Sequence, residues 1–469
     1  MVKLKRPGNI SVCMPPKAED ISRVLEEVAR RRFPTPVERR AIEDRAQRLL
    51  EHARSIIAQI KEADGVTPML VGSVAKGTYL KDPDIDLFLR FPKTTPKVSV
   101  ESVGLRLGKS IFPRGVEKYA QHPYINGEFE GTQVDAVPCM EMDLGSQIMT
   151  AVDRTPLHTQ FIRTHLSEAQ GDQVRYLKAF AKGIGVYGAN EEVQGFSGYL
   201  CELLIVLYGD LAGTLEHAKA WKTGERFLVP GFPDAGLEYD APLVLIDPTD
   251  WKRNVAQAVS THCLQRFKKA ASAFLDRPSN TFFFPNRPRP LTDEAFQDFL
   301  KRFEMFCVSF EIPKILRDSL AAQIRKTERS VCALFLRNGV AVQRSKTFIK
   351  DKAFILLAYE RGAFETPVLH KGPPAKNPHA KNFMDIWTGD LSVVEGPFEK
   401  DGILFVIKAK DFRSPEDLIR QNLDGIGTGK GIRGELSQSL MLAHDRELLR
   451  LDIQEQIAGF IQDKEPWEL

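Results

Sequence analysis

The feature that most constrains this chain is a glycine–serine pair followed, after a turn-rich loop, by two closely spaced aspartates. Gly72 and Ser73 come directly after a short apolar run, and Asp84 and Asp86 open an alternating segment. In a strand, that spacing places both carboxylates on one face, opposite an apolar face. Adjacent carboxylates repel each other unless a cation lies between them, and Mg²⁺ prefers carboxylate oxygens, waters and phosphates. The pattern therefore predicts two strands that bring Mg²⁺ and a phosphate group together.

The same region predicts transfer of a phosphate-bearing group. The Gly-Ser turn supplies backbone N–H groups and a hydroxyl suited to phosphate oxygens. An Asp-x-Asp pair alone usually marks a solvated strand face, but the apolar opposite face and the nearby turn favour the functional interpretation. Two-metal chemistry needs a third carboxylate, for which the candidates are Glu128, Glu130, Asp135, Glu141 and Asp143. We expect Asp135, because an aspartate inside an apolar strand costs free energy unless it has a partner or a metal.

The surrounding sequence predicts a mixture of helices and strands. Thr35 and Glu38 form a capping box with Pro36 at the first helical position, which predicts a long helix. Residues 124–140 predict two strands with a turn near Asn126–Gly127. The pattern is helical from about residue 151 to 275, and residues 278–290 have no period, which predicts a boundary.

Composition sets outer limits on the class of protein. The chain has 469 residues, which suggests about three domains, and a net charge of only +3, which excludes a histone-like or polybasic protein. Its apolar runs are far shorter than a membrane span, and no apolar segment follows the basic N-terminus, so neither a membrane protein nor a secretory signal is predicted. The six cysteines form no Cys-x-x-Cys pair. We therefore expect reduced thiols in a cytoplasmic protein.

Several stretches together carry a resemblance to a known family. Gly72-Ser73 with Asp84-Ile85-Asp86 resembles the motif of the polymerase-β-type nucleotidyltransferase superfamily. The match is closer to the archaeal, class I CCA-adding enzymes, which are tRNA nucleotidyltransferases. The supporting stretches are 122–124, 134–139, 151–156, 195–204 and 252–256. They are collectively specific over about residues 70–260, the resemblance is fainter beyond 290, and the first 20 or so residues resemble an extension outside the family core.

The resemblance implies an α+β multidomain architecture with a polymerase-β-like nucleotidyltransferase head, a helical neck, and an α+β, RRM-like body with an inserted tail. The implied boundaries are 1–150 for the head and 151–285 for the neck, with its nucleotide pocket. The body would comprise 286–330 and 400–469, and the tRNA-binding tail 331–399.

The resemblance also assigns roles to individual residues. Asp84, Asp86 and Asp135 would hold Mg²⁺ and carry catalysis, and Gly72, Ser73 and Lys76 would contact the triphosphate. The pocket would be lined by Thr155, His158, Lys178, Tyr187 and Arg253, with Arg253 reading the base. The residues alone would leave Lys178 on a solvated helix face and His158 at a helix start. The family often has Arg at Lys76 and Glu at Asp84; both changes keep the charge, but Lys lacks the bidentate fork of Arg.

A basic stretch later in the chain predicts an RNA surface. Residues 325–352 hold eight basic residues against two acidic ones, a local net of +6, with Phe335 and Phe348 between them. Such a stretch fits a phosphate-backbone track, although from composition a solvated basic helix face fits comparably. The resemblance favours tRNA binding, for which the expected residues are Arg325, Lys326, Arg329, Arg337, Arg344 and Lys346.

The predicted activity is template-independent addition of CCA to the 3′ end of tRNA from CTP and ATP. The terminal 3′-OH would attack the α-phosphate, and pyrophosphate would leave. The partners would be the acceptor stem and 3′ end of tRNA, with a homodimer suggested by the family. Two alternatives stay open: a poly(A) polymerase-like or other RNA terminal nucleotidyltransferase, and an RNA-binding protein with an inactive transferase domain.

Overall fold

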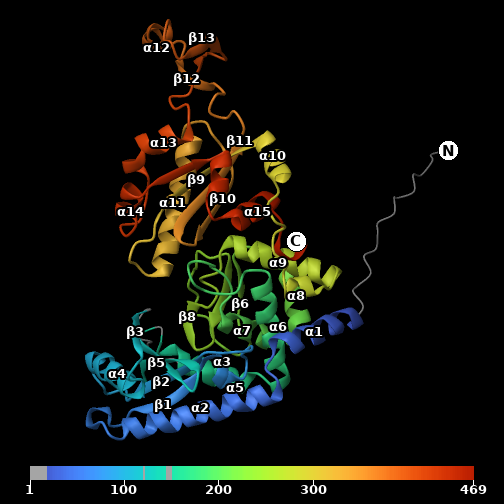
Figure 1. Ribbon diagram of the computed structural model, residues 1–469, viewed down its shortest axis with the longest axis vertical. Coiled ribbons are helices and arrows are strands. Elements are labelled where there is room, and N and C mark those ends of the chain that lie inside the picture. The colour runs from blue at the N-terminus through green and yellow to red at the C-terminus, as the bar shows by residue number, and fades with distance from the viewer. Residues whose placement is uncertain (1–17, 120–121, 144–149, 151) are drawn as a thin grey trace, which may run out of the picture. The chain divides into compact units, whose positions relative to one another are not determined.

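The computed structural model describes residues 18–119, 122–143, 150 and 152–469, and the chain forms two compact units (Figure 1). Unit 1 comprises residues 1–286 and 465–469, and unit 2 comprises residues 287–464. The predicted N-terminal extension lies mostly outside the described residues.

The first sheet of unit 1 positions the aspartates. Its strand order is β1 (Thr67–Val71), β2 (Ile85–Phe91), β5 (Thr132–Met140), β4 (Pro123–Phe129) and β3 (Val116–Tyr119). Strands β2 and β5 are parallel, and the other pairs are antiparallel. Helices α2 (Pro36–Ile57) and α4 (Lys97–Ile111) pack their apolar residues on one face, which carries Leu87 and Ala136. The capping box of Thr35 and Glu38 at the start of α2 is confirmed. Strand alternation therefore directs Asp86 and Asp135 to the opposite face.

Two local predictions in this sheet need correction. The turn between β4 and β5 lies at Glu130–Gly131, both with positive φ (47° and 77°), and the predicted turn at Asn126–Gly127 is wrong. Gly127 lies inside β4, where an added Cβ would come within 2.4 Å of the Phe112 ring, so close packing accounts for that glycine. Gly72 is the first residue of a short helix, α3 (Gly72–Lys76), where a simple turn was expected.

The rest of unit 1 is mainly helical. It contains α1 (Ala18–Arg32), α5 (Arg154–His165), α6 (Glu168–Gly183), α7 (Gly198–Tyr208), α8 (Leu211–Ala220) and α9 (Thr261–Asp276). A sheet of β6 (Glu225–Phe227), β7 (Leu243–Asp247) and β8 (Asp250–Asn254) lies among them, which the helical prediction missed because its strands have only three to five residues. The C-terminal Trp467 stacks on Phe282 at 5.5 Å between ring centroids.

Unit 2 is built on a sheet with the strand order β10 (Val342–Ile349), β11 (Lys352–Glu360), β9 (Phe303–Glu311) and β15 (Met441–His444). Helices α11 (Arg317–Arg337), α13 (Pro415–Gln421) and α14 (Arg433–Gln438) cover one face. Helices α10 (Asp293–Arg302) and α15 (Gln454–Gln462) cover the other. The strand order and the chain order β9-α11-β10-β11-α13-β15 are those of a β-α-β-β-α-β unit.

A second, smaller sheet of unit 2 corrects the predicted tail. Its strand order is β12 (Val368–Pro374), β14 (Ile403–Lys408) and β13 (Val393–Lys400), and α12 (Ala380–Trp387) packs on it. The predicted tail of 331–399 is wrong at both ends, because β10 and β11 pair within the larger sheet and β14 belongs to the smaller one. Residues 353–358 form a continuous apolar run, which marks a strand buried on both faces.

Among the described residues, no single helix has the length and apolar composition of a membrane span. The pair α7 and α8 meets the test only when taken together, and it bends by 93°. Both helices contribute buried side chains to the core of unit 1.

Candidate active site

Two of the predicted carboxylates lie opposite each other in the first sheet. The parallel register of β2 and β5 pairs Asp86 with Asp135, and Asn126 of β4 donates a hydrogen bond of 2.7 Å to Asp135 Oδ1. Asp84 precedes β2 and is exposed. Burial raises the pKa of Asp86 to about 6, and the negative charges of Asp135 and Asp84 add to this effect, while Lys76 opposes it. The site therefore holds more negative charge than its own cations balance.

A bound metal cation would offset this excess of negative charge. No group of three or more His, Cys, Asp or Glu side chains within the described ranges is arranged to hold a metal ion by itself. Mg²⁺ is usually bound through one or two carboxylates, with waters and substrate phosphates completing the shell. Asp86 and Asp135, with Asp84 beside them, fit that kind of site.

Gly72 allows the chain to pass close to the carboxylates. Its φ is +68°, and an added Cβ would lie 1.9 Å from Asp86 Oδ2. Any other residue would displace either the start of α3 or the Asp86 carboxylate. Gly72 is thus held directly beside Asp86.

A buried ion-pair network fixes the loop after α3. Glu202 of α7 accepts from Lys76 Nζ at 2.7 Å, from Lys178 Nζ at 3.1 Å and from the Thr78 hydroxyl at 2.7 Å. The Lys178 ammonium also donates to the carbonyl and hydroxyl oxygens of Thr78. The side chains of Glu202, Lys178 and Lys76 are only 1%, 4% and 7% exposed. Lys178, placed on a solvated helix face by its sequence alone, is therefore buried.

The charges in this network favour an anion nearby. Burial alone would raise the pKa of Glu202, but Lys178, Lys76 and the hydrogen bonds outweigh it and lower the pKa to about 2. Glu202 is thus ionised, and one carboxylate is shared by two ammonium groups. The lysines carry one positive charge more than Glu202 balances.

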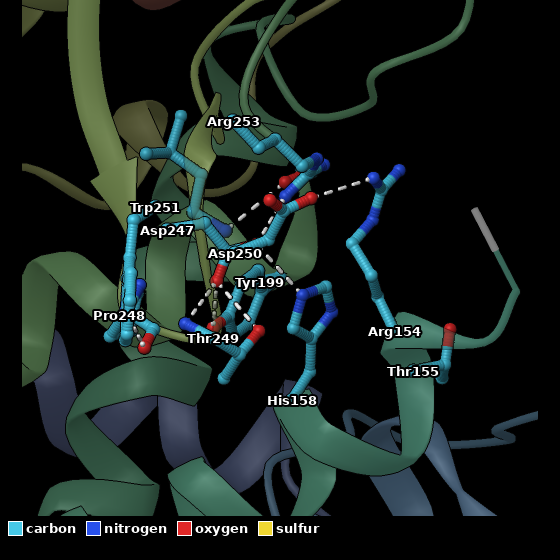
Figure 2. Close-up of polar contacts among 12 residues, drawn as sticks. Arg154, Thr155, His158, Tyr199, Asp247, Pro248, Thr249, Asp250, Trp251 and Arg253 are labelled. Atoms are coloured by element: carbon cyan, nitrogen blue, oxygen red, sulfur yellow. Dashed lines mark hydrogen bonds and ion pairs between the residues drawn. The ribbon is translucent and has the colours of Figure 1, made fainter. Parts of the chain in front are cut away.

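A second buried carboxylate organises the base-reading candidates. Asp247, at the end of β7, accepts from His158 Nε2 and from Arg253 Nη1, both at 2.9 Å (Figure 2). It also accepts from the Tyr199 hydroxyl at 3.2 Å, and the His158 ring stacks on the Tyr199 ring at 3.8 Å. Lys76 Nζ lies 5.4 Å from the centre of the same tyrosine ring. Tyr199 therefore connects the Glu202 network to the Asp247 cluster.

The remaining pocket candidates lie close by. Tyr187 and Lys178 border Gly198, where an added Cβ would be 3.1 Å from the Tyr187 hydroxyl and 3.5 Å from Lys178 Cε. Thr155 lies in the first turn of α5, on the same helix as His158 (Figure 2). The structure thus brings Lys76, His158, Lys178, Tyr187 and Arg253 into one connected region.

Sequence reasoning missed the three residues that hold this region together: Glu202, Asp247 and Tyr199. Glu202 had a usable signal, since it is the one carboxylate in the otherwise apolar stretch 198–208. A lone carboxylate on a buried helix requires cationic or hydrogen-bonding partners. Asp247 ends the apolar stretch 243–247, but nothing in the sequence identifies its partners.

The predicted RNA residues lie in unit 2 and divide into two groups. Lys326, Arg329 and Arg337 are exposed on α11, Lys346 is exposed on β10, and Arg325 is half-buried. Arg344 instead donates to the carbonyls of Phe460 and Ile461 and pairs with Asp463 at 3.3 Å, so it caps the end of α15. Of the two aromatics in this stretch, Phe335 is buried in the core and cannot stack on RNA, and Phe348 is half-buried and stacks on Phe354.

Three protein-family profiles match successive parts of the chain. They are "Nucleotidyltransferase domain" over residues 53–158, "tRNA nucleotidyltransferase, second domain" over 172–284, and "CCA-adding enzyme, C-terminal domain" over 303–445.

Curated relatives match over most of their own length. The chain is 36% identical to the CCA-adding enzyme of Halobacterium salinarum, covering 89% of this chain and 92% of the relative. It is 37% identical to that of Thermoplasma volcanium, covering 78% and 81%, and 32% identical to that of Methanosarcina acetivorans, covering 91% and 94%. A solved structure, the E. coli MS115-1 CdnC:HORMA-deltaN complex, covers 57% of this chain and 94% of its own at 18% identity and a TM-score of 0.43, which is too low to carry an argument.

Replacing Glu202 with Gln should destabilise the protein by about 3–5 kcal/mol at pH 7, because two buried ammonium groups lose their counter-charge. The lowered pKa of Glu202 means that its stabilisation is present above its ordinary value of 4.5 and is lost as the pH falls toward about 2. Denaturant unfolding at several pH values should show this acid dependence in the wild type and a weaker one in E202Q.

The matched control is Glu216→Gln, which removes an exposed carboxylate paired with Lys219 on α8. Its effect should stay within about 0.5 kcal/mol. Equal effects of the two substitutions would contradict the assigned role of Glu202.

Proposed function

This chain belongs to the CCA-adding enzymes, the archaeal-type tRNA nucleotidyltransferases, and we propose that it completes tRNA 3′ ends with a site built on Asp84, Asp86 and Asp135. The family assigns the activity, which is CCA addition to the 3′ end of tRNA by nucleotidyl transfer. Of the alternatives that the sequence left open, this membership favours neither a poly(A) polymerase nor an inactive scaffold. The observation that carries the proposed site is the parallel register of Asp86 and Asp135 beside Gly72.

The reaction joins the terminal ribose oxygen of tRNA to the α-phosphorus of CTP or ATP. As that bond forms, the bond from the α-phosphorus to the pyrophosphate oxygen breaks, and the 3′-OH proton is released. Mg²⁺, when bound, neutralises negative charge on the attacking and leaving oxygens. Among the chain's own residues, Asp84, Asp86 and Asp135 would hold the metal, with Asp135 oriented by Asn126.

The triphosphate would lie between the Gly72–Ser73 segment and the two lysines. Ser73 offers a hydroxyl, and Lys76 is already fixed in place by Glu202. A pre-ordered ammonium loses less side-chain entropy on binding than a free lysine would. The positive charge in excess over Glu202 supports an anionic ligand here.

Base selection would belong to the other end of the same region. No template is implied, so protein groups must choose cytosine and adenine. Arg253 and His158 carry hydrogen-bonding atoms, and Thr155 and Tyr187 would complete the pocket wall. The stacking of His158 on Tyr199, whose ring lies near Lys76, supports one nucleotide spanning both clusters.

We also propose a division into domains that follows the sheets. Residues up to about 150 would form the head and 151–285 the neck, and the β-α-β-β-α-β unit supports an RRM-like body. The tail would comprise about 367–409, around the sheet of β12, β13 and β14. The described cysteines are free, which supports a cytoplasmic location. A homodimer rests on family resemblance, and light scattering in solution tests it.

Asp86→Asn should lower CMP and AMP incorporation into tRNA lacking CCA by about 100-fold or more, since a metal-binding carboxylate is lost. In EDTA at pH 7, the free energy of unfolding of the same variant should exceed that of the wild type by about 1–3 kcal/mol. The reason is that a buried carboxylate with a raised pKa is replaced by a neutral amide. Incorporation assays and denaturant unfolding measure the two effects.

Asp82→Asn serves as the control, because Asp82 is an exposed carboxylate of the same loop with φ of 54°, a conformation that asparagine adopts readily. It should leave both readouts nearly unchanged. Wild-type incorporation by D86N would contradict the proposed site.

The exposed basic face of α11 is proposed to contact the phosphates of the tRNA acceptor stem. Lys326→Ala combined with Arg329→Ala should weaken tRNA binding and reduce the slope of log K against log salt by about one per residue. Equilibrium binding at several salt concentrations measures this. Lys301→Ala on α10, an exposed lysine outside the basic stretch, should leave the slope unchanged. If K301A changed the slope as much as the α11 variant does, the proposed contact between α11 and tRNA would be contradicted.

A further inference from the structure

Asp247 is a buried carboxylate that accepts five hydrogen bonds, and the proposed reaction gives it no role. Its side chain is completely buried, and each of its oxygens has a different set of partners. Oδ1 accepts from the Thr249 backbone N–H at 2.9 Å, the Thr249 hydroxyl at 2.8 Å and the Tyr199 hydroxyl at 3.2 Å. Oδ2 accepts from His158 and from Arg253 (Figure 2).

The two sets of partners suggest two tasks. The bonds to Thr249 lie within the turn between β7 and β8, so they fix the carboxylate to its own backbone. The bonds from His158 and Arg253 connect it to α5 and to β8, from which these two side chains reach toward it (Figure 2). Asp247 thus fixes two residues of the proposed nucleotide pocket relative to the turn between β7 and β8.

The charge states follow from the surroundings. Burial alone would raise the pKa of Asp247, but the hydrogen bond from His158, the charge of Arg253 and the Thr249 donor outweigh it and hold the pKa well below its ordinary range. Burial lowers the pKa of His158 and thereby favours the neutral imidazole at pH 7. A carboxylate only accepts, so the imidazole proton must be on Nε2, which leaves Nδ1 as an acceptor.

Arg253 gains a fixed direction from the same carboxylate. Its Nη1 donates to Asp247, and its side chain is 30% exposed, so other N–H groups of the guanidinium can meet a ligand. Asp247 therefore sets a group of donors on Arg253 and an acceptor on His158 at a fixed spacing.

This donor–acceptor pair matches a chemical feature shared by two of the four bases. Cytosine and adenine each present an amino donor beside a ring-nitrogen acceptor on the pairing edge, whereas uracil and guanine present a carbonyl acceptor beside an N–H donor. A single fixed arrangement can therefore accept the first two bases and reject the others.

We propose that Asp247 is a positioning residue for base selection, holding the Arg253 guanidinium and the Nε2–H tautomer of His158 so that the pocket reads the amino-and-ring-nitrogen edge of CTP and ATP. The proposal rests on the proposed pocket roles of Arg253 and His158. It extends them by making the choice between bases depend on a residue that touches no substrate.

Asp247→Asn is the direct test, because the amide oxygen can keep the Thr249 and Tyr199 bonds while the amide nitrogen replaces Oδ2. His158 must then change tautomer to accept at Nε2, and Arg253 meets a donor. The ratio of kcat/KM for CTP or ATP to that for UTP or GTP, on tRNA lacking CCA or A, should fall by about tenfold or more. Affinity for tRNA should stay within about twofold.

Asp250→Asn is the matched control. Asp250 lies in the same turn region and pairs with Arg154 at 3.1 Å, but it forms no hydrogen bond or ion pair with His158 or Arg253. The same chemical change there should leave the base ratio within about twofold of the wild type. An equal fall in both variants would mean a general disturbance of the turn and would overturn the proposal.

Further variants separate the possible failures. If Arg253→Ala keeps the wild-type base ratio, the proposed pocket role of Arg253 is wrong, whatever D247N does. If Arg253→Ala loses selectivity and folded D247N keeps it, the positioning role of Asp247 is wrong. Should D247N fail to fold, Thr249→Ala loosens the carboxylate at Oδ1 alone and should lower the base ratio about threefold; an unchanged ratio there would overturn the proposal.

Discussion

The region proposed to bind the nucleotide depends on one buried carboxylate. Glu202 lies on an apolar helix, and its burial is tolerated only because Lys76, Lys178 and Thr78 all reach it. Lys76 is the last residue of α3, Thr78 lies in the loop that follows α3, and Lys178 comes from α6. Arg175 of α6 adds bonds to the carbonyls of Gly77 and Tyr79, in the same loop. The segment beside the proposed metal-binding aspartates is thereby fixed to α6 and α7.

Tyr199 connects the side chains proposed to contact the phosphates with those proposed to contact the base. It lies three residues before Glu202 on α7, so its side chain leaves the helix on nearly the same face. Its ring stacks on His158 and its hydroxyl donates to Asp247, while Lys76 Nζ lies 5.4 Å from the centre of the ring. Helix α7 thus carries both Glu202, which accepts from the two lysines, and Tyr199, on which His158 stacks. The geometry of α7 thus contributes to the spacing between the proposed phosphate and base contacts.

The sequence predicted what depends on local periodicity and missed what depends on long-range pairing. The strand of Asp86, the capping box of Thr35 and the strand that contains Asp135 follow from spacing and polarity within a few residues. The turn at Asn126–Gly127 was predicted wrongly because Gly127 is required by packing of Phe112, a contact that no local pattern encodes. The tail boundary failed for the same reason, since β11 pairs with β9 across about fifty residues. Arg344 has the positive charge expected of an RNA-binding residue, but its guanidinium donates to the carbonyls at the end of α15.

The charge balance around each buried carboxylate indicates whether it positions other side chains or is suited to bind a ligand. Glu202 and Asp247 have lowered pKa values, because cations and hydrogen-bond donors surround each of them. Asp86 has a raised pKa, because burial and two other aspartates surround it and a single lysine opposes them. A carboxylate whose charge is already matched gains little from a ligand and serves to orient its partners. A carboxylate whose charge is unmatched costs stability in the free protein, and a cation that arrives with the substrate recovers that cost. The same side-chain chemistry therefore serves as scaffold at two positions and, in the proposed site, as metal ligand at the third.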